Sequence, residues 1–368
     1  MVLFLIIFEV ITKQLSEAST EIKLGMITKI IIYTLSVVFF LLPIKGFATE
    51  VKEKGIIALM YHRFDENKYP TTNIKINDFK KQIQLIKSAN LNFIGYPELK
   101  KILIDKNDYT EKKILITIDD AFQSFYKNAW PILKDNKIPF ILFINTREIN
   151  SKHPNYMTWE QIREIQKSNL ATIGAHSFSH DYLVNLQIDD VKKDLEQSHA
   201  DYLRELGIIP EIFSYPFGEY SLEIKNLVKN FKYLLAFGQH SGVVHKKEDL
   251  YELPRFPINE DYGKIDRFQF LINTSPLPYK FFKPENKLLN NNNPPNIEIE
   301  FEDNVKNINC FTNEGGQWTK SEINFLDDNW IRILLKKEYK PRRGKINCTL
   351  KLTDNTWGWL GKQFVIKD

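Results

Sequence analysis

Short apolar runs and amphipathic stretches alternate through the middle of the chain. The apolar runs are rich in Ile, Leu and Phe, and they predict buried strands at residues 56–61, 92–96, 114–118, 139–145, 171–176, 212–218, 233–237 and 251–256. Between the runs, apolar residues recur every three or four positions, as on the inner face of a helix. This alternation repeats about seven times, which predicts a parallel (β/α) barrel of about seven strands rather than an open sheet.

Local signals mark where several helices begin and end. Asn77 is predicted to cap the first of them, and Thr158 and Gln161 have the spacing of a capping box. Gly207 is predicted to end the long helix before it. Pro131 is expected to kink or end the helix that follows the central strand.

The pattern changes after residue 275. Residues 276–296 are rich in Pro and Asn and are typical of a linker. From 297 to 368, apolar and polar residues alternate without a helical period, which predicts antiparallel strands and a small all-β sandwich. The two cysteines, Cys310 and Cys348, fall there on separate predicted strands, either paired in one disulfide or as two buried thiols.

The first 48 residues predict export. A lysine precedes a nearly unbroken apolar run at 30–42, and small residues follow at Gly46 and Ala48. These are the parts of a signal peptide, here cleaved after Ala48, with translation starting at Met26. The alternative is an uncleaved membrane anchor within residues 1–48, although the run is short for a spanning helix. The rest of the chain is expected in the periplasm, in the cell envelope or outside the cell.

The charge pattern narrows the choice of partners. The formal net charge is +4 over 368 residues, and the lysines are scattered rather than gathered in a stripe. This argues against nucleic acid as a partner. Two cysteines are also too few to build a structural zinc site alone.

Polar side chains stand where several predicted strands end. Asp119 and Asp120 directly follow the central strand, His62 follows the first one, and His176 follows another. Because ligands and chemistry collect at the C-terminal ends of parallel strands, these side chains are candidates for one site. Adjacent acids in a turn point different ways, so one could bind a metal while the other takes a proton. The alternative is that one of them merely caps the next helix.

A second cluster is the H-x-x-x-H sequence from His176 to His180. Two imidazoles and one carboxylate are a common ligand set of a catalytic zinc, and they leave a fourth position open for water. Asp120, His176 and His180 would supply that set from two strand ends. Taken alone, such a histidine pair is more often two solvated loop residues, but its occurrence with the strand-end acids favours a metal site.

Four short motifs resemble a known family. Thr117–Ala121 (T-I-D-D-A) resembles the T-F-D-D-G signature of the NodB-type polysaccharide deacetylases, carbohydrate esterase family 4. His176–His180 matches that family's H-[ST]-x-x-H motif, and Tyr215–Gly218 resembles its R-x-P-[YF]-G motif. Met60–Phe64 (M-Y-H-R-F) resembles the branch that deacetylates poly-N-acetylglucosamine in bacterial envelopes. The resemblance extends over residues 56–258.

The resemblance implies a distorted NodB-like barrel, with the catalytic domain at residues 49–275. It also implies that Asp120, His176 and His180 hold a divalent metal, usually zinc, and that Asp119 is the general base. A metal there would polarise an acetamide carbonyl and acidify a water.

Two further roles follow from the same resemblance. The backbone N–H of Phe217 would help to stabilise the tetrahedral oxyanion. The leaving amine needs an acid, for which the family pattern suggests His62, at a strand end. His240 is the alternative acid.

The sequence departs from the family pattern at two positions near the site. Ala121 stands where the family usually has Gly, so Ala is strained if that position needs a positive φ. Ser214 stands where the family has the arginine that orients the catalytic aspartate. Arg63 or Arg255 could replace that arginine.

The sequence thus predicts a metal-dependent hydrolase that removes N-acetyl groups from an N-acetylglucosamine-containing envelope or extracellular polysaccharide and releases acetate. An O-acetyl esterase or another amidase on the same barrel is one alternative. A non-catalytic carbohydrate-binding protein is another, with a stacking platform formed by Trp318, Trp330, Trp357 and Trp359. Binding alone does not require both aspartates and both histidines, so their presence favours the enzyme.

Overall fold

The computed structural model of the protein describes residues 54–367. The export segment expected at residues 1–48, with its cleavage site and the start at Met26, lies outside the described residues. Between residues 54 and 367, no helix is long and apolar enough to cross a membrane.

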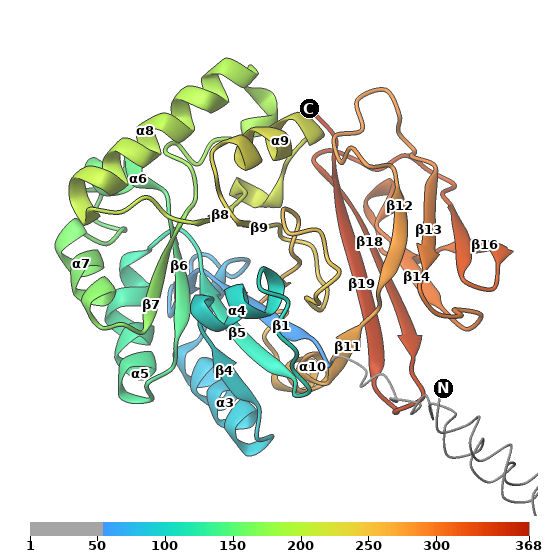
Figure 1. Ribbon diagram of the computed structural model, residues 1–368, viewed down its shortest axis with the longest axis horizontal. Helices are drawn as coiled ribbons and strands as arrows, with labels where there is room; N and C mark the ends of the chain where they lie inside the picture. The colour runs from blue at the N-terminus through green and yellow to red at the C-terminus, as the bar shows by residue number, and fades with distance from the viewer. Residues whose placement is uncertain (1–53, 368) are drawn as a thin grey trace, which may run out of the picture. The chain divides into compact units, whose positions relative to one another are not determined.

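Within the described residues, eight parallel strands form the main sheet (Figure 1). Seven of them follow the order β10-β1-β5-β6-β7-β8-β9, and the eighth, β4, pairs beside β5. Their bounds are β1 (Ile56–Tyr61), β4 (Asn92–Ile94), β5 (Lys113–Ile118), β6 (Phe140–Ile144), β7 (Ala171–Ala175), β8 (Ile212–Ser214), β9 (Leu235–Phe237) and β10 (Phe256–Pro257). The arrangement is that of a distorted NodB-like barrel, so the predicted fold class is confirmed. A parallel ribbon of β2 (Arg63–Phe64) and β3 (Asn73–Ile74) lies outside this sheet.

The prediction of a strand at 251–256 is wrong for most of these residues. Only Phe256 of that range lies in a strand, where β10 pairs with β1. Pro254 has no backbone N–H to donate to a ladder, and the residues before Phe256 form a loop instead.

Helices follow most of the strands, and Figure 1 shows α3, α5, α7 and α8 along the outer side of the sheet. The bounds are α3 (Ile76–Ser88), α4 (Tyr96–Leu103), α5 (Trp130–Asp135), α6 (Thr146–Asn150), α7 (Trp159–Lys167), α8 (Ile188–Leu206), α9 (Leu222–Asn230) and α10 (Ile265–Ile272). Each buries apolar side chains, as Val191, Leu195 and Tyr202 show for α8. The sequence did not predict α4 and α10.

The helix boundaries agree with most of the local signals. Thr158 and Gln161 form the predicted capping box, and Gly207 ends α8 with a left-handed φ of 67°. Pro131 lies in the first turn of α5, where its missing N–H is not needed. The cap predicted at Asn77 is wrong, because α3 already begins at Ile76 and its N-cap residue is Lys75.

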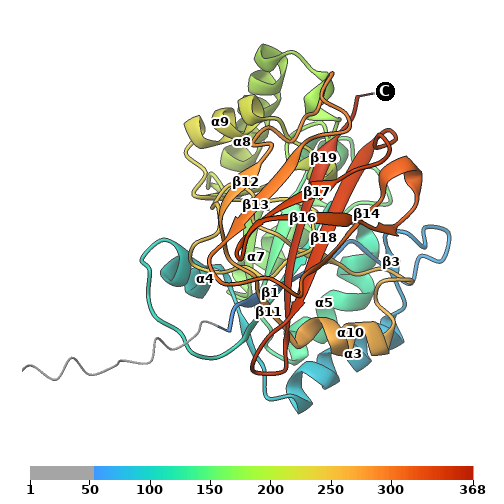
Figure 2. The same ribbon diagram turned by 90° about the vertical axis from the view of Figure 1, so that its right-hand side faces the viewer.

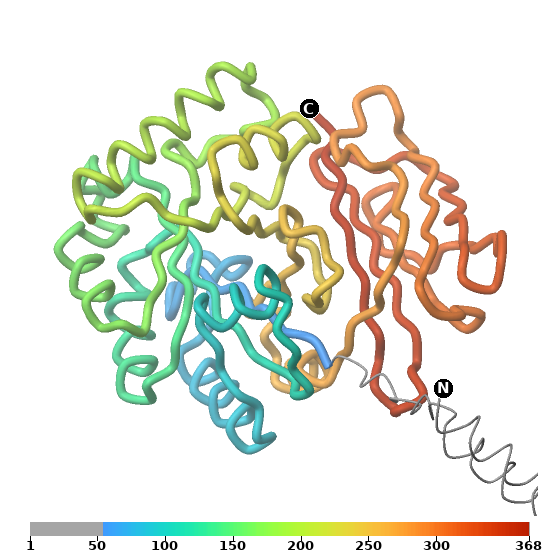
Figure 3. The backbone as a smooth tube through the Cα atoms, in the orientation of Figure 1, coloured from blue at the N-terminus to red at the C-terminus, as the bar shows by residue number. Residues whose placement is uncertain are grey.

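The chain completes the barrel before it enters a β-rich region, as the backbone trace shows (Figure 3). The first sheet of this region has the order β11-β19-β18-β14-β15, and the second has the order β12-β13-β17-β16 (Figure 2). The strands are β11 (Thr274–Pro276), β12 (Tyr279–Lys283), β13 (Ile297–Phe301), β14 (Asn309–Thr312), β15 (Thr319–Lys320), β16 (Glu322–Asp327), β17 (Trp330–Leu334), β18 (Arg343–Lys351) and β19 (Trp357–Val365). The predicted β-sandwich is therefore confirmed, and β12 lies inside the segment expected to be a linker.

The core of the sandwich contains a disulfide. Cys310 on β14 and Cys348 on β18 are direct cross-strand partners, and their sulfurs are bonded. Both residues are buried among side chains of the two sheets, such as Ile346 of the first sheet and Ile299 of the second. Of the two alternatives that the sequence left open, the structure contains the disulfide.

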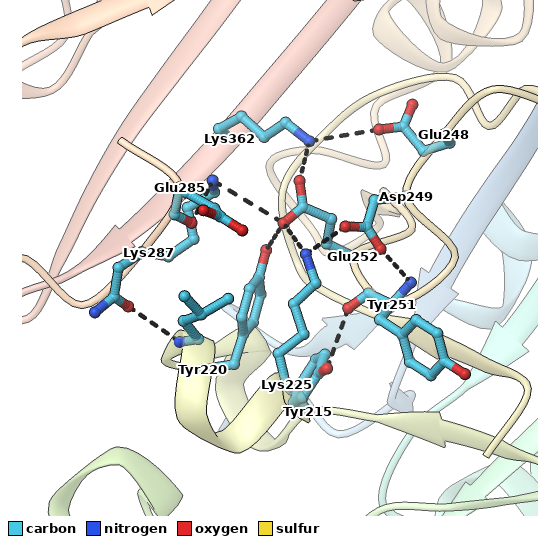
Figure 4. A network of polar contacts seen from close by, with 12 residues as sticks. Tyr215, Tyr220, Lys225, Glu248, Asp249, Tyr251, Glu252, Glu285, Lys287 and Lys362 are labelled. Atoms are coloured by element: carbon cyan, nitrogen blue, oxygen red, sulfur yellow. Dashed lines mark hydrogen bonds and ion pairs between the residues drawn. The ribbon is translucent and has the colours of Figure 1, made fainter. Parts of the chain in front are cut away.

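A buried network of charges joins the β region to the barrel (Figure 4). Lys362 on β19 is fully buried, and its ammonium group lies 2.7 Å from Glu252 and 3.4 Å from Glu248, both in the loop after β9. Glu252 also contacts Lys225 of α9 at 3.2 Å, and the Tyr279 hydroxyl lies 2.7 Å from Lys362. A buried charged side chain stays ionised only if it has partners of opposite charge. Lys362 in the β region and Glu248 and Glu252 in the barrel therefore depend on each other.

We expect Lys362→Met to lower the free energy of unfolding by about 3 kcal/mol, because it leaves Glu248 and Glu252 buried with one cation fewer. Lys280→Met is the control. Lys280 forms an exposed pair with Glu300 at 3.2 Å, and losing such a pair changes stability by less than about 1 kcal/mol. Urea unfolding at pH 7 compares the two variants, and an equal loss in both would contradict the importance of the buried network.

Candidate active site

The two acids of the central strand lie at the rim of the barrel. Asp119 follows β5 directly, and its backbone N–H donates to the carbonyl of Tyr61 at the end of β1 over 2.9 Å. His62 continues β1 and His176 continues β7, so the C-terminal ends of three strands of one sheet bring all four side chains together. The structure therefore joins the strand-end residues that the sequence singled out.

Asp120, His176 and His180 meet at one point, with ligand atoms all within 4.8 Å of one another. Oδ1 of Asp120 lies 3.4 Å from Nε2 of His176 and 3.2 Å from Nε2 of His180. Nδ1 of His176 donates to the carbonyl of Ser214 over 2.6 Å, which leaves Nε2 as an acceptor. Asp120 Oδ1 and His176 Nε2 are buried and have no hydrogen-bond partner. Two acceptors that face each other need a positive charge between them, so these residues fit a divalent metal.

The backbone around this centre is strained. Asp120 and Ala121 have φ angles of 71° and 54°, and His180 and Phe217 have 55° and 59°. For residues with a Cβ this left-handed conformation costs about 1–2 kcal/mol each, and strain of this kind clusters at functional sites. Ala121 occupies the glycine position of the family motif, so the positive φ anticipated there is present.

Asp194, which the sequence analysis missed, holds the histidine loop in place. It is buried on α8, and its carboxylate accepts hydrogen bonds from the N–H groups of Phe178 at 2.8 Å and Ser179 at 2.9 Å. The hydroxyl of Ser177 accepts a further bond from the His180 N–H at 2.9 Å. The only sequence signal was a carboxylate on the inward face of an amphipathic helix.

Asp119 is fully buried, and Arg255 pairs with both of its oxygens. The two guanidinium nitrogens lie 2.6 and 2.8 Å from the carboxylate, and one of them also donates to the Ser214 hydroxyl at 2.8 Å. Burial would raise the pKa of Asp119, but Arg255 and the neighbouring imidazoles hold it below its usual value. Arg255 therefore pairs with Asp119 in place of the arginine that the family motif has at the position of Ser214. Arg63, the other candidate, pairs with Glu66 at 2.7 Å instead.

The two candidate acids lie in different surroundings. Nε2 of His62 is 3.9 Å from Oδ2 of Asp119, and the side chain is 12% exposed. Burial lowers the pKa of His62, and the charges of Asp120 and Asp119 oppose this effect. His240 is buried with both ring nitrogens unpartnered, and the charges that act on it are mainly those of Lys362 and Glu252. His240 thus lies close to the charge network between the barrel and the β region without bonding to it.

Phe217 lies in a tight turn beside the candidate metal ligands. Its ring centroid is 4.6 Å from that of His180 and 4.1 Å from that of Tyr182. The next residue, Gly218, has a φ of 67°, and a Cβ there would come within 2.5 Å of the backbone nitrogen of Gln239. The turn therefore requires glycine at this position, and it places the Phe217 ring against that of His180.

Comparison with known proteins assigns part of the chain to a family. A family model described as polysaccharide deacetylase matches residues 106–236, which include Asp119, Asp120 and both histidines. Residues 106–236 therefore form a polysaccharide deacetylase domain. The chain has the fold of polysaccharide N-deacetylases, and its relatives include enzymes of this kind.

The relatives and solved structures match little more than half of this chain. A poly-beta-1,6-N-acetyl-D-glucosamine N-deacetylase of Staphylococcus aureus is 25% identical over 240 residues, which is 57% of this chain and 81% of the relative. IcaB of Ammonifex degensii has a TM-score of 0.54 at 24% identity and covers 60% of this chain and 98% of its own. The Streptococcus pyogenes deacetylase PplD, solved with acetate, has a TM-score of 0.52 at 21% identity, with 56% and 93% covered. These structural likenesses concern the fold.

The buried His240 gives a testable dependence of stability on pH. Burial lowers its pKa to about 3, whereas an unfolded histidine titrates near 6.5. Below about pH 6.5 the unfolded chain takes up a proton that the folded deacetylase does not, so stability falls with a slope of about 1.4 kcal/mol per pH unit. In metal-free protein, we expect the wild type to lose about 2 kcal/mol more than His240→Leu between pH 7 and pH 5. Denaturant unfolding at several pH values measures this difference, and equal slopes would contradict the assignment.

Proposed function

We propose that the protein is a metal-dependent hydrolase that removes N-acetyl groups from an N-acetylglucosamine-containing envelope or extracellular polysaccharide and releases acetate. One observation carries the proposal. A candidate ligand set of Asp120, His176 and His180 lies beside a separate buried carboxylate, Asp119, inside a polysaccharide deacetylase domain. The proposal places the chemistry in residues 49–275. The segment 276–296, expected to be a linker, already contributes β12 to the β region.

The ligand atoms would be Asp120 Oδ1, His176 Nε2 and His180 Nε2, and zinc or another divalent cation suits such a set. A bound metal would supply Lewis acidity for the acetamide carbonyl and lower the pKa of a water. The fit rests on the two buried acceptors that have no hydrogen-bond partner, Asp120 Oδ1 and His176 Nε2.

Asp119 would act as the general base. Its ion pair with Arg255 keeps it an anion at neutral pH. Its Oδ2 lies 4.0 Å from Nε2 of His176, so it borders the ligand set without belonging to it. It would take a proton from the attacking water as the water oxygen bonds to the carbonyl carbon.

The remaining steps would use His62 and the backbone N–H of Phe217. The N–H would donate to the oxyanion that forms at the carbonyl oxygen. When the carbon–nitrogen bond breaks, the amine nitrogen needs a proton, and the His62 imidazole would supply it. We prefer His62 to His240 because His62 lies 3.9 Å from Asp119. The charges that act on His240 come mainly from Lys362 and Glu252, at the interface with the β region.

Two observations support the polymer and the compartment. The Staphylococcus aureus relative is named for poly-beta-1,6-N-acetyl-D-glucosamine, and a polymer of this type is the substrate we propose. The Cys310–Cys348 disulfide is typical of exported proteins, since the cytosol keeps thiols reduced. An exported enzyme would meet such a polymer in the envelope or outside the cell.

We expect acetate release from poly-N-acetylglucosamine, with chitin oligomers and peptidoglycan as comparison substrates. Chelation should abolish the release and added zinc should restore it. Asp119→Asn should lose at least about a hundredfold in kcat, because the base is removed, yet keep its metal. His176→Ala should lose both activity and metal. Acetate assays and metal analysis of the purified proteins measure these effects.

The contrast between the two variants is the control. Full metal occupancy in His176→Ala would argue against the ligand assignment. Asp119→Asn with wild-type turnover would remove the proposed base. Release of acetate from O-acetylated sugars alone would change the reaction from amide to ester hydrolysis.

His62→Gln should lower kcat for the acetamide about a hundredfold or more, since the departing amine must be protonated. It should affect an aryl acetate much less, because a phenolate leaves without a proton. His240→Leu is the matched control and should keep its activity on both substrates. Parallel losses of His62→Gln on both substrates would disprove the role as acid.

A further inference from the structure

The turn that carries Phe217 holds a strained conformation between β8 and α9. Phe217 and Gly218 both have positive φ angles, of 59° and 67°. The turn has two short-range hydrogen bonds of its own, from Gly218 N–H to the Tyr215 carbonyl and from Glu219 N–H to the Pro216 carbonyl. A non-glycine residue in this conformation persists when the surroundings hold it. Further support comes from the β region.

Gln363 on β19 supports the turn through its backbone. Its side-chain amide donates to the carbonyls of both Phe217 and Gly218, each over 3.1 Å. Gln363 is 2% exposed, and the preceding residue, Lys362, is anchored in the charge network of Figure 4. Strand β19 therefore forms an ion pair with the barrel through Lys362 and hydrogen bonds to the strained turn through Gln363.

Glu219, at the end of the turn, is clamped from the start of β18. Its carboxylate is fully buried and accepts from Nε of Arg342 at 2.8 Å and from Nε of Arg343 at 2.8 Å. A buried carboxylate depends on such partners, because its desolvation is otherwise uncompensated. The two arginines thereby restrict where Glu219 and the turn before it can lie.

The same arginines cover the aromatic side of the turn. The Arg342 guanidinium lies 3.9 Å from the ring centroid of Tyr182, and that of Arg343 lies 5.4 Å from the ring of Phe217. Tyr182 stacks on Phe217, and Phe217 contacts the ring of His180. Contacts therefore run without a break from the β region to a candidate metal ligand.

We propose that the β region positions the Phe217 turn for catalysis, with Arg342, Arg343 and Gln363 as positioning residues that act through Glu219 and the turn backbone. This inference rests on the proposed function, because it gives the Phe217 N–H its place near the reacting carbonyl. The three side chains lie outside the matched family segment, residues 106–236. They do not touch the metal ligands, so their effect should appear in kcat rather than in metal binding.

Arg343→Ala tests the proposal, with Arg332→Ala as the matched control. Arg332 pairs with Glu298 at 2.8 Å within the β region, and its side chain is 39% exposed, against 32% for Arg343. We expect Arg343→Ala to lower kcat about tenfold or more, since small displacements of a catalytic group have large effects. KM and metal content should stay as in the wild type. Arg343→Lys should recover part of kcat, and Arg332→Ala should behave as the wild type.

Gln363→Met provides a second variant that keeps the side-chain volume and removes both hydrogen bonds to the turn. It should lower kcat in the same way. Hydrogen–deuterium exchange of residues 215–219 should become faster in both Gln363→Met and Arg343→Ala, but not in Arg332→Ala. This readout does not depend on activity.

The outcomes separate the two proposals. Wild-type kcat in folded Arg343→Ala and Gln363→Met overturns the positioning role, and so does an equal loss in Arg332→Ala. If the wild type releases no acetate from any of the three polymers, the proposed function fails. Hydrogen–deuterium exchange of residues 215–219 then decides the positioning role. Faster exchange in Arg343→Ala and Gln363→Met than in the wild type supports it, and unchanged exchange overturns it.

Discussion

Two neighbouring carboxylates are buried at the end of the central strand, and each has its own partners. Asp119 pairs with Arg255 through both oxygens, whereas Asp120 faces the Nε2 atoms of His176 and His180. Two buried anions side by side would otherwise raise each other's pKa and share one proton. Separate partners let Asp119 stay a base while Asp120 turns its oxygen toward the imidazoles. The division of labour in the proposed reaction depends on this difference.

The same constraint explains how the β region is attached. Lys362 reaches Glu248 and Glu252 in the barrel, and Glu219 of the barrel receives two arginines from the start of β18. A buried charge without a partner destabilises the protein, so the charges buried between the barrel and the β region must pair with one another. The ion pairs therefore fix the position of the β region beside the barrel rim, and the neighbouring Gln363 reaches the Phe217 turn.

The sequence predicted those features that depend on neighbouring residues. The apolar run at 114–118, the capping box at Thr158 and the glycine that ends α8 were all recognisable, because each acts over a few residues. The strand-end position of the acids and the H-x-x-x-H spacing predicted the cluster that the structure brings together. The motif marked Ala121 as a position that would be strained if its φ were positive, and the structure shows that it is positive.

Features that depend on distant residues were not predictable in this way. Arg255 lies 136 positions from Asp119, and no local pattern marks it as that partner rather than Arg63. The clamp on Glu219 joins residues more than a hundred positions apart. The choice between a disulfide and two thiols depended on the register of β14 and β18, which places the two cysteines opposite each other. Composition alone does not determine strand register.

The central claim is that Asp120, His176 and His180 form one metal centre and that Asp119 stays outside it. X-ray crystallography of the zinc-loaded protein, with anomalous scattering at the zinc edge, tests it most directly. We expect one anomalous peak, about 2.0–2.2 Å from Asp120 Oδ1 and from Nε2 of both histidines, with the Asp119–Arg255 pair intact. Zinc bound elsewhere, or coordinated by Asp119 in place of Asp120, would contradict the account.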